Sequence, residues 1–189
     1  LPLSTNDGRS LLEFDFLLMD TKKSRMMAKL FMKYLRSSGK VHVTTPAGTD
    51  MMFYKENRNP GFFNGVLRDG KGYSSSSIEV YVPIEETKTE GIMVLDGSLG
   101  YIGRADEPTR IIFKGGRIVD IEETPTGIRL KKYMEEYFDP RIYIAGELGI
   151  GLNSCSNCLG NCYIEDESAY GTFHVGLGPV SYTHLTLPT

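Results

Sequence analysis

Three segments of the chain place an acidic or imidazole side chain among strand-like and glycine-rich residues, where core packing does not require one. Glu79 lies in the run SIEVYVP, Glu147 in AGELGIG and His174 in GTFHVG. Carboxylate and imidazole groups bind divalent cations such as zinc, cobalt or manganese. The three residues define a candidate metal site if the fold brings them together, which their separation along the chain cannot show.

Each residue also has an interpretation that needs no ligand. Alternation in the strand around Glu79 places it on the same face as Tyr81, and this pattern alone favours a solvent-facing carboxylate. Three glycines around Glu147 fit either a surface turn or a carboxylate directed into a site. A lone histidine in a strand, such as His174, is more often a hydrogen-bonded core or surface residue than a ligand. The acidic triplet 165–167 predicts a solvated turn, although Asp166 and its neighbours could orient His174.

Other chemistries have less support. The cysteines form one cluster with the spacing C-x2-C-x3-C, at Cys155, Cys158 and Cys162. An odd, clustered set indicates neither a disulfide framework nor a four-thiolate zinc site, so we expect free thiols in a loop. The sequence has no phosphate-binding loop and no G-x-S-x-G nucleophile elbow. We expect His42, within a strand of β-branched neighbours, to be structural.

The elements that must position these residues mix helices with many strands. A helix begins after Asp20 or Thr21, which can cap its free amides, and ends at Gly39. We expect its apolar stripe to pack into the core; the stripe consists of Met26, Met27, Leu30, Phe31, Tyr34 and Leu35. A second helix is predicted over 126–137. Strands are predicted at 41–44, 51–54, 78–84, 91–95, 111–113, 117–121, 143–151 and 171–178, with a loop-rich segment over 55–77.

Short connections between these strands, including a hairpin at Lys114-Gly115-Gly116, favour antiparallel pairing. The predicted fold class is therefore α+β, with a largely antiparallel sheet and two main helices. The net charge of −3 gives no reason to expect nucleic acid as a partner. No apolar stretch approaches the roughly 20 residues that span a bilayer, and no signal peptide is visible. These features, with the unpaired cysteines, predict a cytoplasmic protein without a membrane partner.

The ends of the sequence suggest a fragment. It begins Leu1-Pro2 without an initiator methionine, so residues 1–38 are interpreted as the tail of an upstream α/β domain or a connecting helix. Residues 39–179 would form a partial metal-binding domain. The string VSYTHLTLPT over 180–189 resembles translated sequencing adapter, and we exclude Tyr182 and His184 from the candidate ligands on that ground.

Several segments resemble the aminopeptidase T family of metal-dependent aminopeptidases. The resemblance runs from about residue 12 to residue 178 and is carried by TTPAGTDMMF (44–53), IEVYVPIEET (78–87), GIMVLDGSLGYIG (91–103), IIFKGGRIVDIE (111–122), AGELGIGLN (145–153) and GNCYIEDESAYGTFHVGLG (160–178). It implies a truncated metallopeptidase catalytic domain. One departure is Ile78, where the family usually has glycine before the first ligand.

The resemblance also implies a site and a reaction. Glu79, Glu147 and His174 match family positions that bind a pair of divalent metal ions, here zinc, cobalt or manganese. The metals would activate water to remove N-terminal residues from a peptide substrate, with the general base unassigned. The family further implies a homodimer. Its remaining ligands would lie beyond Gly178, so we expect this fragment to be inactive alone.

Two alternatives remain. The same superfamily resembles a mononuclear iron dioxygenase that opens dihydroxypyridine rings, which would hold one iron rather than two hydrolytic metals. The presence of both Glu79 and Glu147 favours the peptidase. The other alternative is a non-catalytic relative that retains the carboxylates without binding metal tightly.

Overall fold

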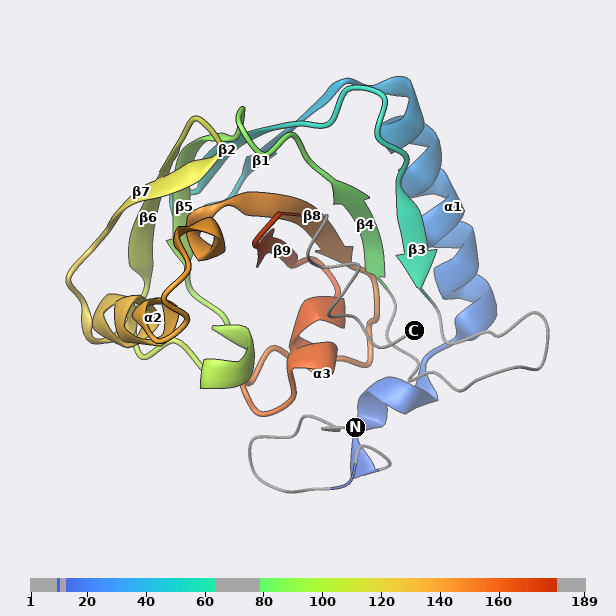
Figure 1. Ribbon diagram of the computed structural model, residues 1–189. Coiled ribbons are helices and arrows are strands. Elements are labelled where there is room, and N and C mark those ends of the chain that lie inside the picture. Colours follow the sequence, from blue (N-terminus) through green and yellow to red (C-terminus); the bar gives the residue numbers. More distant parts are fainter. Residues whose placement is uncertain (1–9, 11–12, 64–78, 180–189) are drawn as a thin grey trace.

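The computed structural model describes residue 10 and residues 13–63 and 79–179. These residues form two antiparallel sheets with α1 and α2 as the main helices, which confirms the predicted α+β class (Figure 1). The helices are α1 (Thr21–Ser37), α2 (Pro125–Glu135) and the short α3 (Tyr163–Ser168), and the 3-10 segments are η2 (Asp15–Leu18), η3 (Gly100–Ile102) and η4 (Pro140–Tyr143).

The first sheet has five strands in the order β1-β2-β5-β6-β7. Their bounds are β1 (Lys40–Thr44), β2 (Asp50–Tyr54), β5 (Glu90–Leu95), β6 (Thr109–Lys114) and β7 (Arg117–Ile121). The predicted β6–β7 hairpin is confirmed. Gly115 and Gly116 both adopt positive φ, at 57° and 77°, which most other residues tolerate poorly. This sheet follows the sequence pattern because its turns are short and local.

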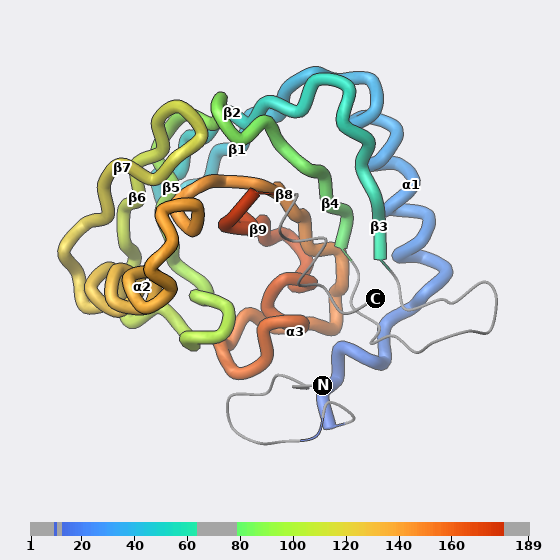
Figure 2. Tube along the Cα trace, in the orientation of Figure 1, coloured from blue at the N-terminus to red at the C-terminus, as the bar shows by residue number. Residues whose placement is uncertain are grey.

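The second sheet has four strands in the order β3-β4-β8-β9. Their bounds are β3 (Gly61–Phe63), β4 (Glu79–Pro83), β8 (Ala145–Gly151) and β9 (Phe173–Leu177). The chain leaves the first sheet after β2, forms β3 and β4, and returns for β5. Strands β8 and β9 then pair onto β4, so segments far apart in the sequence become neighbours (Figure 2). Strand β3 lies within the segment that we predicted to be loop-rich.

Helix α1 begins where the sequence predicts but turns a different face to the core. The Asp20 carboxylate accepts hydrogen bonds from the backbone amides of Lys22 and Lys23, at 3.0 and 2.9 Å. The buried residues of α1 are Ser24, Ala28, Met32 and Leu35, whereas Met26, Leu30, Phe31 and Tyr34 are exposed. The predicted core stripe was therefore largely wrong. The buried face combines the small Ser24 and Ala28 with Met32 and Leu35, and α1 packs with it against β3 and β4, beside which it lies in Figure 1.

A single hydrophobic core joins both sheets with α1 and α2. In the four-stranded sheet, Val80, Val82 and Leu148 are fully buried on one face, with Ile150 and Val175 beside them. The opposite face of that sheet is therefore the one available to Glu79 and His174.

Helix α1 contributes to this same core, and the division predicted at residue 38 stays a prediction. The predicted adapter segment 180–189 lies outside the described residues. Among the helices described, none combines the length and apolar character required to cross a bilayer.

Candidate metal site

The candidate site lies on the polar face of the four-stranded sheet. Pairing places Glu79 of β4 opposite Gly151 of β8, and Gly149 of β8 opposite His174 of β9. Directly paired residues in an antiparallel sheet share a face, and so do residues two apart along a strand. Glu79 and His174 therefore share a face while lying on strands that flank β8.

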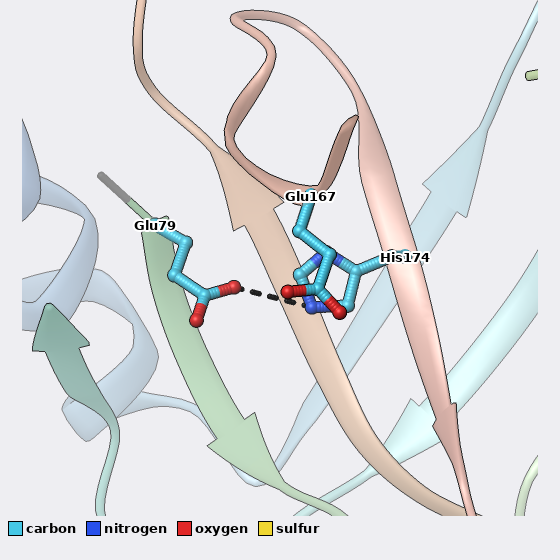
Figure 3. A group of neighbouring side chains, drawn as sticks. All are labelled: Glu79, Glu167 and His174. Carbon is cyan, nitrogen blue, oxygen red and sulfur yellow. Dashed lines mark ion pairs between the residues drawn. The ribbon is translucent and has the colours of Figure 1, made fainter. Parts of the chain in front are cut away.

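Gly149 allows the imidazole to cross β8. A Cβ atom built on Gly149 would lie 2.8 Å from Nδ1 of His174 and closer still to Cε1 and Nε2. The ring thus occupies the space that a side chain of β8 would fill, and its Nε2 comes within 3.2 Å of Oε2 of Glu79 (Figure 3). The sequence left open whether the glycines around Glu147 form a surface turn or part of a site. Gly149 belongs to the site, because its lack of a side chain leaves room for the imidazole.

Glu167 completes the group from α3. Ligand atoms of Glu79, Glu167 and His174 all lie within 4.8 Å of one another, and the three residues are partly buried. Figure 3 shows the Glu167 carboxylate beside the imidazole, with Glu79 approaching from β4. Within the described part of the chain this is the one such group of His, Cys, Asp and Glu residues.

The acidic triplet that contains Glu167 is not a solvated turn, so that prediction was wrong. Glu165 accepts a hydrogen bond from the backbone amide of Asn157 at 3.0 Å. Asp166 accepts from the amides of Leu159 and Gly160, at 2.9 and 3.0 Å. Both carboxylates are buried and fasten the loop before α3 to the helix. Asp166 therefore holds the loop, and it is Glu167 whose carboxylate lies within 4.8 Å of a ring nitrogen of His174.

Glu147 lies on the same face, two residues along β8 from Gly149. It pairs with Pro83 of β4 and Gly176 of β9, and it is outside the group of three. Burial and the charge of Glu79 raise the pKa of Glu147, while His174 acts in the opposite direction. The charge of Glu147 therefore affects the pKa of His174 from a neighbouring position on the sheet. The predicted ligand set of Glu79, Glu147 and His174 stays a prediction. Two of its members, Glu79 and His174, are in contact in the structure.

Electrostatics in the group favour a cation. Burial alone would lower the pKa of His174, but Glu79, Glu167 and Glu147 outweigh it and raise the value to about 9. Burial raises the pKa of Glu167 to about 7, with His174 opposing and the other carboxylates adding to the shift. Three carboxylates around one imidazole thus carry more negative charge than a single imidazolium neutralises.

Two atoms of the group lack a hydrogen bond within the described residues. Oε2 of Glu79 and Nδ1 of His174 are both buried without one, since the close approach of Oε2 to Nε2 is not aligned as a hydrogen bond. A buried carboxylate oxygen is costly unless a cation neutralises it, and here the protonated imidazole of His174, 3.2 Å away, occupies the place that a metal ion would take. Two carboxylates and an imidazole are also suitable zinc or manganese ligands. The residues present therefore fit a divalent metal ion.

Comparison with known proteins shows the fold. No protein-family model matches the chain, and no curated protein matches it. Among solved structures, 2,5-dihydroxypyridine dioxygenase from Pseudomonas putida KT2440 is similar with a TM-score of 0.66 and 22% identity, over 84% of this chain and 49% of that one. Wild-type AmpT from Thermus thermophilus is similar with a TM-score of 0.60 and 15% identity, over 84% of this chain and 42% of AmpT.

The chain thus spans about half the length of its structural neighbours. At these identities the similarity establishes a shared architecture, and the two neighbours carry the names of the two enzyme classes considered from the sequence.

The cysteines do not add a second metal centre within the described residues. All three are free, and Cys162 is buried. Burial, with the charges of Asp166 and Asp96, raises the pKa of Cys158 to about 11. Among the described residues, the one group of three possible ligands contains no cysteine. His42 forms an ion pair with Asp50 at 2.8 Å on β1 and β2, in the other sheet from the candidate site.

Sequence reasoning missed Glu167. Helix α3 is six residues long, too short for a helical repeat to reveal it. One signal was available: Glu167 lies seven positions before His174, within the segment that carries the family resemblance. Glu165 and Asp166 are held by hydrogen bonds to backbone amides of the loop before α3, and this leaves Glu167 to turn toward the imidazole.

Proposed function

We propose that this chain carries the metal site of a metal-dependent hydrolase that removes N-terminal residues from peptides. The supporting observation is the convergence of Glu79, Glu167 and His174 within 4.8 Å on one face of the sheet. A hydrolytic metal centre needs a few protein ligands and a position left open for water. Glu147, two residues from Gly149 along β8 and on the same face, would bind a second divalent cation or take part in proton transfer.

Each residue has a defined part in this proposal. Glu79, Glu167 and His174 would hold the cation, and Gly149 keeps the imidazole in place across β8. A bound zinc, cobalt or manganese ion would lower the pKa of water and polarise the peptide carbonyl. Glu147 is partly buried, and burial raises its pKa, which suits it to accept a proton from metal-bound water.

The dioxygenase is the second candidate because its structure has the higher TM-score of the two neighbours, 0.66 against 0.60. Mononuclear iron oxygenases typically use two histidines and one carboxylate. The group here has one histidine and two carboxylates. His42, the other histidine of the described residues, is ion-paired in the five-stranded sheet. A group that already holds two carboxylates departs from that pattern, which supports the hydrolase. A non-catalytic binding relative is the third candidate.

Metal binding is the first test. Zinc titrated into the metal-stripped protein in a calorimeter should bind, and His174→Ala, Glu79→Gln and Glu167→Gln should each weaken binding about 100-fold or more. His42→Ala and Glu123→Gln are matched controls, since His42 is exposed and ion-paired elsewhere and the Glu123 side chain is 86% exposed. Equal zinc affinity in the wild type and the three site variants would refute the proposed site.

Substrate class is the second test. A leucyl chromogenic amide and 2,5-dihydroxypyridine should be compared with zinc, cobalt, manganese and ferrous iron, on this chain and on the longer protein if it is a segment of one. Amide hydrolysis supports the peptidase, ring opening with iron supports the dioxygenase, and metal binding without either reaction supports the binding relative. We further propose a cytoplasmic homodimer; sedimentation and cell fractionation test these two properties.

A further inference from the structure

Two tyrosine pairs lie on the elements around α3. Tyr101 of η3 packs against Tyr163 of α3 with ring centroids 4.5 Å apart and a tilt of 42°. Tyr133 and Tyr137 lie at the end of α2 with ring centroids 5.3 Å apart, and their hydroxyl oxygens are 2.7 Å apart. None of these four residues is needed to hold the proposed metal.

The first pair adjoins the candidate metal site. Tyr163 and Glu167 are four residues apart on α3, a spacing that places two side chains on the same face of a helix. Glu167 points to the imidazole from that face (Figure 3). Tyr163, with the tilted ring of Tyr101 packed against it, therefore lies one helical turn from a proposed ligand.

The second pair continues from the first. Segment η3 contacts both α3 and α2, and Figure 1 shows it between the two helices. The pKa of Tyr101 is raised by burial, by a hydrogen bond with Tyr163 and by the nearby charges of Tyr163, Glu167 and Tyr133. Segment η3, which carries Tyr101, therefore adjoins both the helix that bears Glu167 and the helix that bears Tyr133.

The rings remain accessible. Tyr101 is 59% exposed and Tyr137 is 52% exposed, and their inner partners Tyr163 and Tyr133 are partly buried. A tyrosine ring offers an apolar face and a hydroxyl that can hydrogen-bond, which suits a surface contacting both side chains and backbone amides. The inner tyrosines fix the orientation of the outer ones, so a ligand would meet rings that are already ordered.

We propose that Tyr101, Tyr163, Tyr133 and Tyr137 form a track that binds the part of a peptide substrate extending away from the candidate metal site. The proposal rests on the proposed peptidase function. Two ring pairs offer more surface than one six-membered ring covers, and an extended peptide advances about 3.3 Å per residue. Tyr101 and Tyr163 would contact the residues nearest the metal, and Tyr133 and Tyr137 those further along.

Binding to metal-free protein tests the track without catalysis. The probes are Leu-Phe amide and the pentapeptide Leu-Phe-Gly-Phe-Gly amide, with affinity measured by calorimetry. We expect the pentapeptide to bind at least about fivefold more tightly. Tyr101→Ala should weaken both peptides between about twofold and tenfold, whereas Tyr137→Ala should remove the advantage of length and leave the dipeptide unchanged.

The controls separate a specific track from general loss of structure. Tyr34→Ala removes a tyrosine that is 65% exposed on α1, away from the track, and should change neither affinity. Tyr101→Phe keeps the ring and should retain most of the binding. Circular dichroism and zinc titration of each variant report whether fold and metal site persist. If the two peptides bind equally, or Tyr101→Ala and Tyr34→Ala behave alike, the track is wrong.

The result is distinguishable from failure of the proposed function. Zinc binding that depends on His174, without an effect of peptide length, would retain the metal site and reject the track. Length-dependent binding that requires Tyr101 and Tyr137, without zinc binding, would retain the track and reject the hydrolase.

Discussion

The position of His174 depends on the side chain that Gly149 lacks. The imidazole lies where a Cβ of β8 would be, and this allows a residue of β9 to reach Glu79 on β4. The geometry of the candidate metal site thus depends on a residue that would bind no metal. A ligand whose orientation depends on a neighbouring residue typically loses affinity when that neighbour changes.

Gly149→Ala tests this dependence. Gly149 lies in a strand and lacks a positive φ, so alanine fits the backbone and its Cβ displaces the imidazole. We expect zinc affinity to fall between about tenfold and 100-fold, with secondary structure retained. Gly39→Ala is the matched control, because its Cβ would meet no atom within 4 Å. Unchanged zinc affinity in Gly149→Ala would show that the ring does not need this space.

Zinc binding should release protons, because His174 has a pKa of about 9 in the metal-free protein. At neutral pH the imidazole is protonated, and a metal must displace that proton. Affinity should therefore rise about tenfold per pH unit between pH 7 and pH 9. It should fall further below pH 7, where Glu167, with a pKa of about 7, also takes up a proton. Calorimetry at pH 7.5 in buffers of different ionisation enthalpy should show release of about one proton; a pH-independent affinity would contradict the assignment.

Residue identity predicted part of this chemistry. Glu79 and His174 stand out because a carboxylate and an imidazole interrupt apolar strands, and the structure places them 3.2 Å apart. Glu167 could not be chosen over Glu165 and Asp166, since all three are acidic and adjacent. Their roles differ only because two of them hydrogen-bond to backbone amides of the preceding loop.

At the scale of elements, α3 is positioned by its own acidic residues. The loop before it is held by Asp166, which is buried and accepts hydrogen bonds from two amides. Gly151 adds to this arrangement, because a Cβ there would clash with the carbonyl oxygen of Ala169 at the end of α3. The short helix therefore lies close to β8, and this position places Glu167 near Glu79 and His174.

Asp166→Ala should destabilise the protein by about 2–3 kcal/mol, because the amides of Leu159 and Gly160, one part-buried and one buried, lose a charged acceptor. Zinc affinity should fall as well, since Glu167 is the next residue on the helix. Urea unfolding and zinc calorimetry measure the two effects. Asp120→Ala, an exposed position on β7, should change stability by no more than about 0.5 kcal/mol. Wild-type stability and zinc affinity in Asp166→Ala would show that the loop does not position the helix.

The elements differ in how far the sequence predicted them. Helix α1 was predicted from Asp20 and Gly39, and β6–β7 from Gly115 and Gly116, because caps and tight turns are local. The buried face of α1 was predicted wrongly. The pattern of large apolar residues indicated one face, but the face that packs on the sheet carries Ser24 and Ala28 together with Met32 and Leu35.

At the scale of the molecule, the three proposed ligands connect elements from distant parts of the chain. Glu79 begins β4, Glu167 lies in α3 and His174 lies in β9. A cation held by all three would bind the folded state and not the unfolded chain. Metal binding should therefore stabilise the whole fold in proportion to its affinity.

Zinc at 100 times its dissociation constant should add about 2.7 kcal/mol to the free energy of unfolding. For a chain of this size, we expect the Tm to rise by roughly 5–11 °C. Differential scanning calorimetry with and without zinc measures the shift, and EDTA should reverse it. His174→Ala should show no shift. A Tm that does not respond to zinc in the wild type would argue against a site spanning these elements.

The pairing of β8 with β4, which are far apart in the sequence, affects the order in which the protein folds. β5, β6 and β7 follow one another along the chain, so their hairpins can close early and at small entropic cost. β8 and β9 must instead find β4 after the whole intervening segment has been made. During refolding, amides of β6 and β7 should become protected from hydrogen exchange before those of β9. The cation-binding surface would then be among the last parts of the molecule to mature.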